Sequence, residues 1–474
     1  MIGAVSPAST GHAPSPSLQD SPQRCRGIPE GRSCVHFSLA SLLAPQRPYA
    51  CRGVTAHLSP FIRLTSDWRR SKICTATVYE IFRLDDQLLQ AVVRTGSSVL
   101  HILSLINALA IELPSVGTDL ALALLRAVPG VERIDGDSLL SLQGQGGDGQ
   151  GGDGESFVTP GADPANEFYP WGIDWIGAAD VQAEYPGLAG DGVKVALIDT
   201  GVDPTHADLQ QNIIGGYNSM ANEDPRNWRD DNGHGTHVAG TLAARLNSKG
   251  VIGMAPRVRI YVFKALDRNG TGRTSDVINA LQRVPADMRI IAGSCGTDLV
   301  WPSFEDAIHR LYQSGKLMVF SAGNYCTANT AQGQGGDASC TTTPPADIKF
   351  PARYPGVIAV GATNGSDQVP SFSRSGRAMA DHGVVAPGVD IFSTNLGRGY
   401  GWMSGTSAAT PHVTGAVALA LALRPRLSYE DLLDLLWQTA KDCSYHPEQQ
   451  GAGRIDVEKM VRRLKRGTDE DRDE

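Results

Sequence analysis

The feature that most constrains the fold is an alternation of short apolar runs with helical patterns between residues 166 and 460. Five of the runs are expected to be buried strands, at positions 193–198, 258–263, 289–292, 317–321 and 357–360. Runs this apolar are typical of parallel strands that are covered on both faces by the helices between them. We therefore expect an α/β fold with three layers, in which helices flank a doubly wound, mainly parallel sheet.

A smaller unit precedes this domain at residues 77–142. Residues 99–113 resemble two strands around a turn, 118–127 have helical spacing, and 131–134 form another apolar run. These patterns predict a small α+β domain.

The remaining segments have the composition of connecting or terminal chain. Residues 1–76 are rich in Pro, Ser and Arg without periodicity, which predicts a poorly ordered leader. Residues 143–165 contain GQGGDGQGGDGE, which is typical of a flexible linker. Residues 461–474 are strongly charged, and we expect a solvated tail after the domain at 166–460.

The charge distribution excludes some partners. Residues 1–76 hold nine Lys or Arg and three Asp or Glu, a net charge of +6; the whole chain has 42 and 50, so the rest has 33 and 47, a net charge of −14. An acidic globular part argues against nucleic acid, because phosphate binding needs clustered cations. No apolar run reaches membrane-spanning length, so no membrane span is expected.

Eight cysteines are too few to build a disulfide scaffold in a chain of 474 residues. No C-x-x-C pair occurs, which argues against a zinc ribbon. Cys326 and Cys340 bracket a Gly- and Thr-rich loop. They form either one disulfide, which would indicate an oxidising compartment, or two free thiols.

The first candidate for catalysis is Asp199, in Asp-Thr-Gly directly after the run at 193–198. A carboxylate at the carboxyl end of a parallel strand lies where such sheets bind ligands. It could instead only close a turn before Gly201. Aspartic proteases also use this tripeptide, but they need a second one, and the chain has no other.

The second candidate is His234, in the segment Asn-Gly-His-Gly-Thr-His-Val-Ala-Gly at 232–240. Histidine is the usual general base near neutral pH. The pair His234 and His237 could suggest a metal site, but no Glu lies between them. We expect His234 to be the base and His237 to support it.

The third candidate is Ser407, in Gly-Thr-Ser-Ala-Ala-Thr-Pro-His-Val at 405–413, just before an apolar stretch at 413–423 that predicts a buried helix. Exposed N–H groups at the start of a helix favour an oxyanion, although a Ser there is also a common N-cap. A serine nucleophile needs a base, which a third group orients. The candidates Asp199, His234 and Ser407 supply all three.

This order of Asp, His and Ser, with the motifs DTG, HGTHVAG and GTSAATPHV, resembles the subtilisin-like serine proteases (subtilases) over residues 166–460. The resemblance implies a serine endopeptidase with the subtilisin-like fold. It also implies that Asn324, in Ser-Ala-Gly-Asn after the run at 317–321, supplies the oxyanion hole.

The resemblance also implies a substrate site and a metal. Two segments would pair with an extended polypeptide substrate, and Gly323 would line the pocket for the residue before the cut; the segments are Gly270, Thr271, Gly272 and Ser294, Cys295, Gly296. A structural Ca²⁺ would be held by oxygens, with side chains from Asp208 and Asn247, carbonyls from Arg245, Lys249 and Val251, and Glu167 as a further ligand. Phe350-Pro351 resembles a family Tyr-Pro that is often cis.

The unit at 77–142 is similar to subtilase propeptides, which implies a zymogen. The propeptide would act as an intramolecular inhibitor and be removed by self-cleavage within 143–166. We expect a monomer. A propeptide, calcium and a disulfide favour secretion to the extracellular space, whereas the lack of a clear signal-peptide pattern leaves an intracellular enzyme open.

Two alternatives belong to other classes. A catalytically silent relative would act in binding or folding assistance, but all four catalytic positions are present. A sedolisin-like acid protease would carry an Asp in place of Asn324 and would lack the His-Gly-Thr-His segment.

Overall fold

The computed structural model describes residues 76–81, 86–129, 131–142, 159–161, 164–325 and 347–470. The leader before residue 76, linker positions 143–158, and both Cys326 and Cys340 lie outside the described residues. The predictions of a poorly ordered leader, of a disulfide and of a processing segment therefore fall largely on those parts of the chain.

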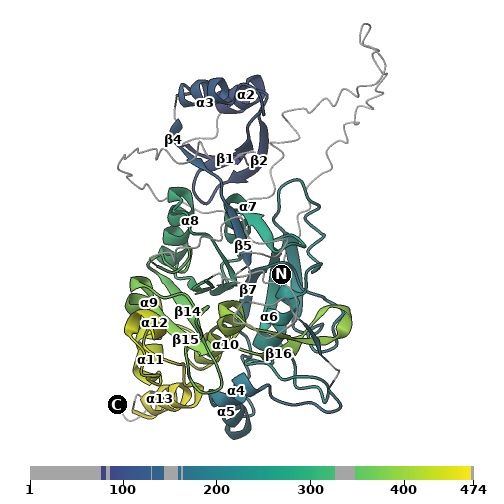
Figure 1. The fold of residues 1–474 in the computed structure, drawn as a ribbon, viewed down its shortest axis with the longest axis vertical. Coiled ribbons are helices and arrows are strands. Elements are labelled where there is room, and N and C mark those ends of the chain that lie inside the picture. Colours follow the sequence, from purple (N-terminus) through teal and green to yellow (C-terminus); the bar gives the residue numbers. More distant parts are fainter. Residues whose placement is uncertain are drawn as a thin grey trace, which may run out of the picture. The chain divides into compact units, whose positions relative to one another are not determined.

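The centre of the fold is a seven-stranded sheet in which every neighbouring pair is parallel (Figure 1). Its strands, in spatial order, are β15 (Gly383–Pro387), β14 (Val357–Thr363), β13 (Leu317–Ser321), β11 (Ile290–Gly293), β7 (Lys194–Asp199), β9 (Arg259–Lys264) and β8 (Ile213–Asn218). All five apolar runs are strands of this sheet. The prediction of an α/β fold with a parallel sheet is confirmed.

The strand order reverses at β7. From β7 the chain runs to β8 at the edge, returns through β9, and then crosses β7 to add β11, β13, β14 and β15 on the other side. Parallel α/β sheets bind ligands at the carboxyl ends of the strands where the order reverses, because the connections diverge there and leave a crevice. The end of β7 is therefore the favoured place for a site.

Both faces of the sheet are buried. Side chains alternate along each strand, so that Val195 and Leu197 of β7 pack into one core cluster, whereas Ala196 and Ile198 pack into the other. The helices are α4 (Trp171–Trp175), α5 (Ala178–Glu184), α6 (His234–Ala243), α7 (Thr274–Leu281), α8 (Pro302–Gln313), α9 (Arg377–His382), α10 (Thr406–Leu423), α11 (Tyr429–Thr439), α12 (Pro447–Gln450) and α13 (Val457–Glu470).

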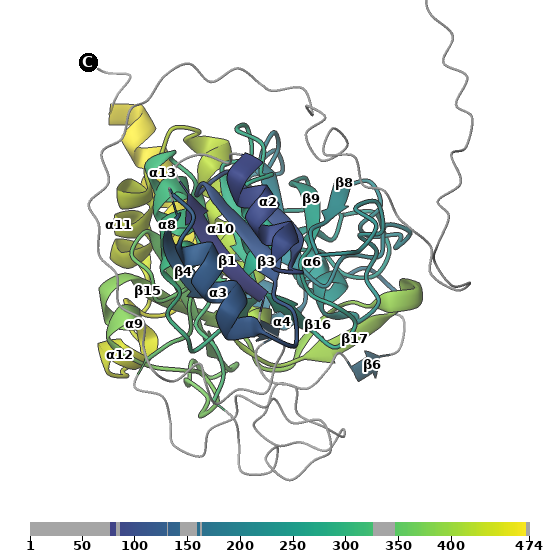
Figure 2. The same ribbon diagram turned by 90° about the horizontal axis from the view of Figure 1, so that it is seen from above.

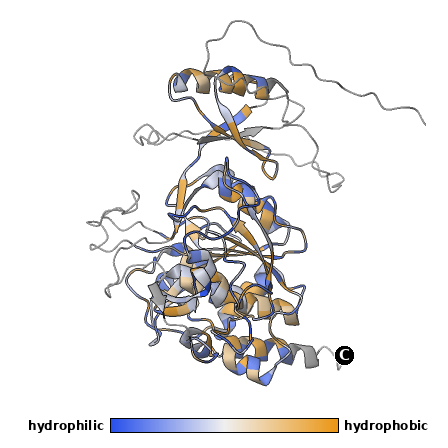
Figure 3. Ribbon diagram, turned by 90° about the vertical axis from the view of Figure 1, so that its right-hand side faces the viewer, coloured by the Kyte–Doolittle hydropathy of each residue, from blue (hydrophilic) through white to orange (hydrophobic). Residues whose placement is uncertain are grey.

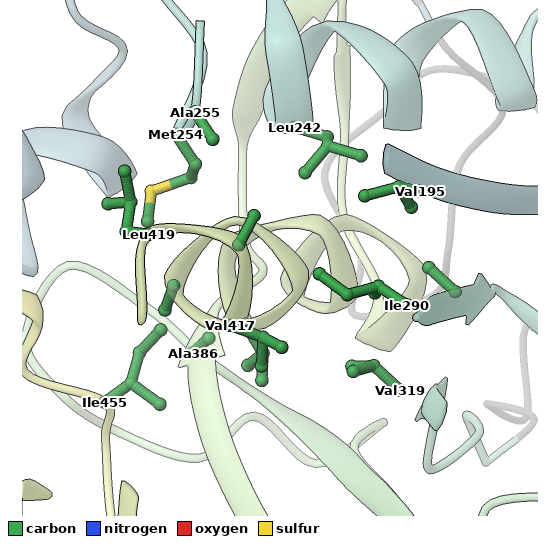
Figure 4. Packing of buried hydrophobic residues seen from close by; sticks show 14 of the residues in the cluster. Val195, Leu242, Met254, Ala255, Ile290, Val319, Ala386, Val417, Leu419 and Ile455 are labelled. Atoms are coloured by element: carbon green, nitrogen blue, oxygen red, sulfur yellow. The ribbon is translucent and has the colours of Figure 1, made fainter. Parts of the chain in front are cut away.

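Helix α10 is the core helix of one face. Figure 4 shows its residues Val417 and Leu419 among side chains from the sheet, including Ile290 and Val319. Its length and composition would suffice to cross a membrane, but 89% of its apolar window is buried inside the domain. We therefore interpret it as the core of the domain, and it is the one such helix among the described residues.

Helix α13 runs from Val457 to Glu470, across the boundary at residue 460 that the charge pattern suggested. Val461 and Leu464 are buried in the same core cluster as α10. The packed domain thus extends beyond residue 460, because apolar residues at helical spacing are interleaved with the charges.

Residues 76–136 form a second, smaller α+β unit. An antiparallel sheet has the order β2-β3-β1-β4, and α2 and α3 pack against it around their own apolar cluster (Figure 2). The elements are β1 (Ala76–Ile81), α2 (Asp86–Arg94), β2 (Ser98–Leu103), β3 (Ala108–Glu112), α3 (Thr118–Arg126) and β4 (Val131–Gly136). Both helices carry apolar and polar residues (Figure 3), as expected for helices with one buried face.

Two three-stranded sheets complete the described structure. One has the order β10-β5-β12, with β5 (Leu139–Leu142) between β10 (Thr271–Arg273) and β12 (Cys295–Gly296). The other joins β16 (Ile391–Thr394), β17 (Tyr400–Met403) and β6 (Thr159–Gly161). The Phe350–Pro351 peptide bond is cis, as the resemblance implied.

Candidate active site

Asp199 and His234 form the centre of the candidate site. Asp199 is the last residue of β7 and is fully buried, and its Oδ1 lies 2.7 Å from His234 Nδ1. The backbone N–H of Thr200 donates to the same oxygen, at 2.7 Å. Because an ionised carboxylate can only accept, Nδ1 carries the proton of the neutral ring. Nε2 is then the ring nitrogen that can accept a proton from another group.

Glycines allow the start of α6 to approach the end of β7. A Cβ on Gly235 would lie 2.1 Å from the carbonyl oxygen of Gly201 and 3.0 Å from Asp199 Oδ1. Gly201 itself has φ of +113°, a conformation that side chains disfavour. The glycines of the Asp-Thr-Gly and His-Gly-Thr-His motifs thus hold the carboxylate and the imidazole together.

Asp230, which the sequence analysis did not identify, organises the same region. Its Oδ1 accepts from Thr200 Oγ1 at 2.8 Å and from the N–H groups of Asn232 and Gly233 at 3.0 Å. Its Oδ2 accepts from Thr236 N–H at 2.9 Å and from the Thr236 hydroxyl. The carboxylate therefore ties the residue after Asp199 to the first turn of α6. The cluster of Asp and Asn directly before His234 was the available signal, because such residues commonly bond nearby backbone N–H groups.

Ser407 lies in the first turn of α10, where backbone N–H groups have no helical partners. Its Oγ donates to the Ser294 carbonyl at 3.3 Å, and Ser294 Oγ donates to the Ser407 carbonyl at 3.4 Å. Pro411 has no N–H, so it cannot bond the carbonyl of Ser407 one turn earlier. Ser294 takes the place of that missing helical donor and joins the two segments.

These contacts bring the three candidates to one edge of the sheet. The last residue of β11, Gly293, is in register with Ile198 of β7, so Ser294 and Asp199 are the next residues on adjacent strands. Ser294 contacts Ser407, Asp199 contacts His234, and the helices that begin at these two sites, α10 and α6, pack against each other.

Asn324 follows β13 and is buried at the start of α10. Its Oδ1 accepts from the N–H of Thr406 at 3.1 Å and from the Thr406 hydroxyl at 2.9 Å. Gly323, with φ of +104°, donates its N–H to Thr406 Oγ1 at 3.2 Å. Since the oxygen of the Asn324 amide is held by Thr406, the residue before Ser407, the orientation of its NH₂ group is also determined.

The two predicted substrate segments lie on either side of β5. Gly272 pairs with Leu140, and the Gly270 carbonyl accepts from the N–H of Leu142 at 2.8 Å. On the other side Cys295 pairs with Leu142. Strand β5, which directly follows the smaller α+β unit, thus occupies the place expected for an extended peptide.

Two further buried polar side chains support this region. His237 Nε2 lies 2.9 Å from the Ile391 carbonyl, and burial lowers its pKa to about 3, so it is neutral near pH 7. Lys264 Nζ donates to the carbonyl groups of Thr200 and Leu266 and to Asp231. Lys264 therefore holds the loop after β7 in place, whereas His237 joins α6 to the start of β16.

The predicted calcium ligands come from three segments of the chain that contact one another. Asp208 Oδ2 accepts from Val251 N–H at 3.1 Å and from the Tyr400 hydroxyl at 2.9 Å, while Asn247 Nδ2 donates to Oδ1 at 3.1 Å. Glu167 accepts from the N–H groups of Asn247 and Ser248, the latter at 2.9 Å. Asn247 Oδ1 is buried and has no hydrogen-bond partner among the described residues. Within the described ranges no cluster of three or more His, Cys, Asp or Glu could hold a metal, so any ion here would need amide and carbonyl oxygens.

A carboxylate that orients an imidazole, a serine hydroxyl at a helix start and an amide beside it form the constellation of a serine protease on a parallel α/β fold. The family model described as "Subtilase family" matches residues 190–454. The chain belongs to the subtilase family of subtilisin-like serine proteases.

Several curated relatives are similar over the same region. Subtilisin DY of Bacillus licheniformis is 38% identical over 293 residues, which are 61% of this chain and 97% of the relative. Subtilisin of Bacillus pumilus is 39% identical over 272 residues, 57% of this chain and 91% of the relative. Subtilisin E of Bacillus subtilis (strain 168) is 39% identical over 272 residues, again 57% of this chain, but the match spans only 66% of the relative's length.

Proposed function

We propose that the chain is a serine endopeptidase in which Asp199, His234 and Ser407 form the catalytic triad. The observation that carries the proposal is the contact of 2.7 Å between His234 Nδ1 and Asp199 Oδ1. Ser407 supports it, because it lies in the first turn of α10, the helix that packs against α6. This tautomer provides a basic Nε2, the atom that a serine nucleophile needs.

In the proposed reaction, Ser407 Oγ attacks the carbonyl carbon of a peptide bond and transfers its proton to His234. His234 then protonates the leaving amine, and water hydrolyses the acyl-enzyme in the same way. Asp199 orients the imidazole and stabilises its charged form. The Asn324 amide and the Ser407 N–H bind the oxyanion, and removing such a donor typically costs about 2.7–4 kcal/mol.

A fluorophosphonate probe tests this function, because it labels only an activated serine. We expect labelling of the mature protein, with the adduct mapped to Ser407 by peptide mass analysis. Ser407→Ala should remove it, whereas Ser294→Ala, which changes the adjacent serine, should retain the adduct. A folded, processed chain that takes up no probe would instead support the alternative of a catalytically silent relative.

We also propose that residues 77–142 are a propeptide that inhibits the enzyme within the same chain. Strand β5 between β10 and β12 supports this, because a strand in that place excludes a substrate. The proposed propeptide also caps two helices of the larger domain. Asp135 accepts from Ser303 N–H at 3.2 Å at the start of α8, and Asp137 accepts from Ser275 N–H at 2.9 Å at the start of α7.

The register of β5 suggests where self-cleavage takes place. Cys295 pairs with Leu142, and the preceding residue, Ser294, contacts Ser407 Oγ. Because β5 and β12 are antiparallel, the last described residue of β5, Leu142, is at the end of the strand that leads toward Ser294 and the proposed nucleophile. We therefore expect the chain to be cut after Gln143.

Mass mapping of the amino terminus tests this proposal. The wild-type chain should yield a mature product that begins at Gly144, and Ser407→Ala should remain uncut there. The same mature terminus in both proteins would contradict self-cleavage, and a terminus far from Gly144 would contradict the register.

We propose a structural Ca²⁺ where the segments of Asp208 and Asn247 meet. The buried Asn247 Oδ1 supports it, because an oxygen without a hydrogen-bond donor suits a hard cation. Glu167 and the carbonyl groups of Arg245, Lys249 and Val251 are the proposed further ligands. We expect CaCl₂ to raise the melting temperature of the Ser407→Ala protein and EDTA to lower it, with both effects lost in Asn247→Ala. A calcium response that survives this substitution would place the ion elsewhere.

The proposed partners are polypeptide substrates, and the proposed active form is a monomer outside the cell. An intracellular location is the alternative. Fractionation of the native host with an antibody against the mature domain would distinguish the two, and light scattering would give the oligomeric state.

A further inference from the structure

We propose that Arg374 is a positioning residue for Asn324, acting through the backbone of that asparagine and held in turn by Asp298. The proposal rests on the assignment of Asn324 to the oxyanion hole, and it concerns an ion pair that none of the catalytic motifs contains.

Arg374 contacts Asn324 directly. Its Nε donates to the Asn324 carbonyl at 3.1 Å, and its own backbone N–H donates to the carbonyl of Gly323 at 2.9 Å. Ser373 forms a β-bridge with Asn324, and Tyr325 donates its N–H to the Phe372 carbonyl at 2.7 Å. The segment 323–325 is therefore bonded at every residue to the segment 372–374.

The Arg374 side chain is only 5% exposed, so its charge needs a partner. Asp298 supplies it, because both terminal nitrogens of the guanidinium donate to the two oxygens of this carboxylate. The guanidinium carbon of Arg374 also lies over the ring of Tyr325, 5.5 Å from the ring centroid. With two nitrogens bound to Asp298, the planar group has one orientation, and Nε is aimed at Asn324.

The position of Asp298 gives this ion pair its relevance to the reaction. Asp298 lies two residues after β12, the strand that pairs with β5 in the proposed substrate cleft. The Asp298–Arg374 pair thus joins the segment after β12 to the backbone of Asn324. On the opposite side, Thr406 holds the Asn324 side chain next to Ser407. Asn324 is therefore held at two points: Arg374 binds its backbone carbonyl, and Thr406 binds its side-chain amide oxygen.

We expect these two contacts to affect the stability of the transition state more than the affinity for substrate. An oxyanion donor works because its position is set before charge develops, and a displacement of about 1 Å can cost about 10²-fold in rate. Loss of Arg374 loosens the donor without removing it. We therefore expect Arg374→Met to lower kcat by about tenfold, a smaller loss than the 10²–10³-fold typical of removing the donor itself, with KM changed by less than about twofold.

A double-mutant cycle on the mature enzyme with a chromogenic peptide substrate tests this inference. If Arg374 acts through Asn324, then Arg374→Met should change kcat by less than about twofold in the Asn324→Ala background. Arg374→Lys keeps the charge but not the fork, and it should restore part of kcat. Asp298→Asn, which is isosteric and at a partly exposed position, should lower kcat in the same direction. If Arg374→Met fails to fold, Asp298→Asn takes its place in the experiment.

The matched control is Arg454→Met. Arg454 is a similarly buried arginine, 7% exposed, whose Nε pairs with Asp367 at 2.7 Å away from the proposed triad. We expect this variant to lower the melting temperature and leave kcat unchanged. Two results would overturn this inference and leave the proposed function intact. The first is an active wild type whose kcat is unaffected by Arg374→Met and Asp298→Asn. The second is a loss of kcat from Arg374→Met that is as large in the Asn324→Ala background as in the wild type. A processed wild-type chain that hydrolyses no peptide would overturn the proposed function together with this inference.

Discussion

The carboxylate of Asp230 offers the sharpest test of how the candidate site is held together. It accepts five hydrogen bonds, of which three are on Oδ1 and two are on Oδ2, and the donors come from both sides of the Asp199–His234 contact. Asp230→Asn is isosteric but replaces one oxygen by an NH₂ group. The change therefore alters hydrogen bonding while volume and packing stay the same.

The size of the effect follows from these contacts. If the amide oxygen keeps the three bonds of Oδ1, the NH₂ group faces the Thr236 N–H, which then has a donor opposite it. An unsatisfied buried donor costs about 1–3 kcal/mol, and the remaining bonds lose their charge assistance. We expect the free energy of unfolding to fall by about 2–3 kcal/mol, and the melting temperature by roughly 5–10 °C.

The assay is thermal unfolding in the Ser407→Ala background, which excludes self-digestion in the proposed protease. The control is Asp224→Asn, an isosteric change in an exposed ion pair with Arg226, which should leave the melting temperature nearly unchanged because water screens such a pair. In the active protein, Asp230→Asn should also lower the rate of fluorophosphonate labelling, because Thr200 and the first turn of α6 lose their common acceptor. Equal melting temperatures for the two Asn variants would refute the assigned role of Asp230.

Three further predictions address the triad, the helix contact and the proposed propeptide. Asp199→Asn should lower kcat by about 10⁴-fold with little change in melting temperature, since Nδ1 loses the acceptor that selects its tautomer; a decrease under tenfold would argue against a triad. Gly235→Ala should destabilise the protein by more than about 1 kcal/mol, because its Cβ would lie 2.1 Å from the Gly201 oxygen, and a wild-type melting curve would contradict the packing. Burial raises the pKa of Asp137 from 3.8 to about 7, so the folded protein is more stable while this carboxyl group is protonated. This contribution to stability is lost as the pH rises from about 4 to about 7. Urea unfolding of the Ser407→Ala protein at pH 4.5 and pH 8 should show this loss, and Asp137→Asn should reduce the difference; an unchanged difference would exclude Asp137 as its source.

Much of the central sheet could be predicted from the sequence because its strands are covered on both faces. Strand β13 coincides with an apolar run, and β7, β9 and β11 are displaced from theirs by one residue. The edge strand β8, with sequence IIGGYN, was missed since its glycines interrupt the apolar pattern. In the smaller unit, β1 and α2 were missed, while β3 and α3 followed clear patterns.

The sequence by itself indicated the proposed chemistry, because an acid after a strand, a histidine between glycines and a serine before an apolar helix are local patterns that need no knowledge of distant contacts. Only the tertiary structure revealed Asp230 as a shared acceptor, the Arg374–Asp298 pair at Asn324, and β5 between β10 and β12. These depend on which segments meet in space: Arg374 lies 76 residues from Asp298, and β5 pairs with residues more than 120 positions away. Hydrophobic periodicity indicates which face of a helix or strand is buried, but it carries no information about which polar side chains from distant segments contact that element.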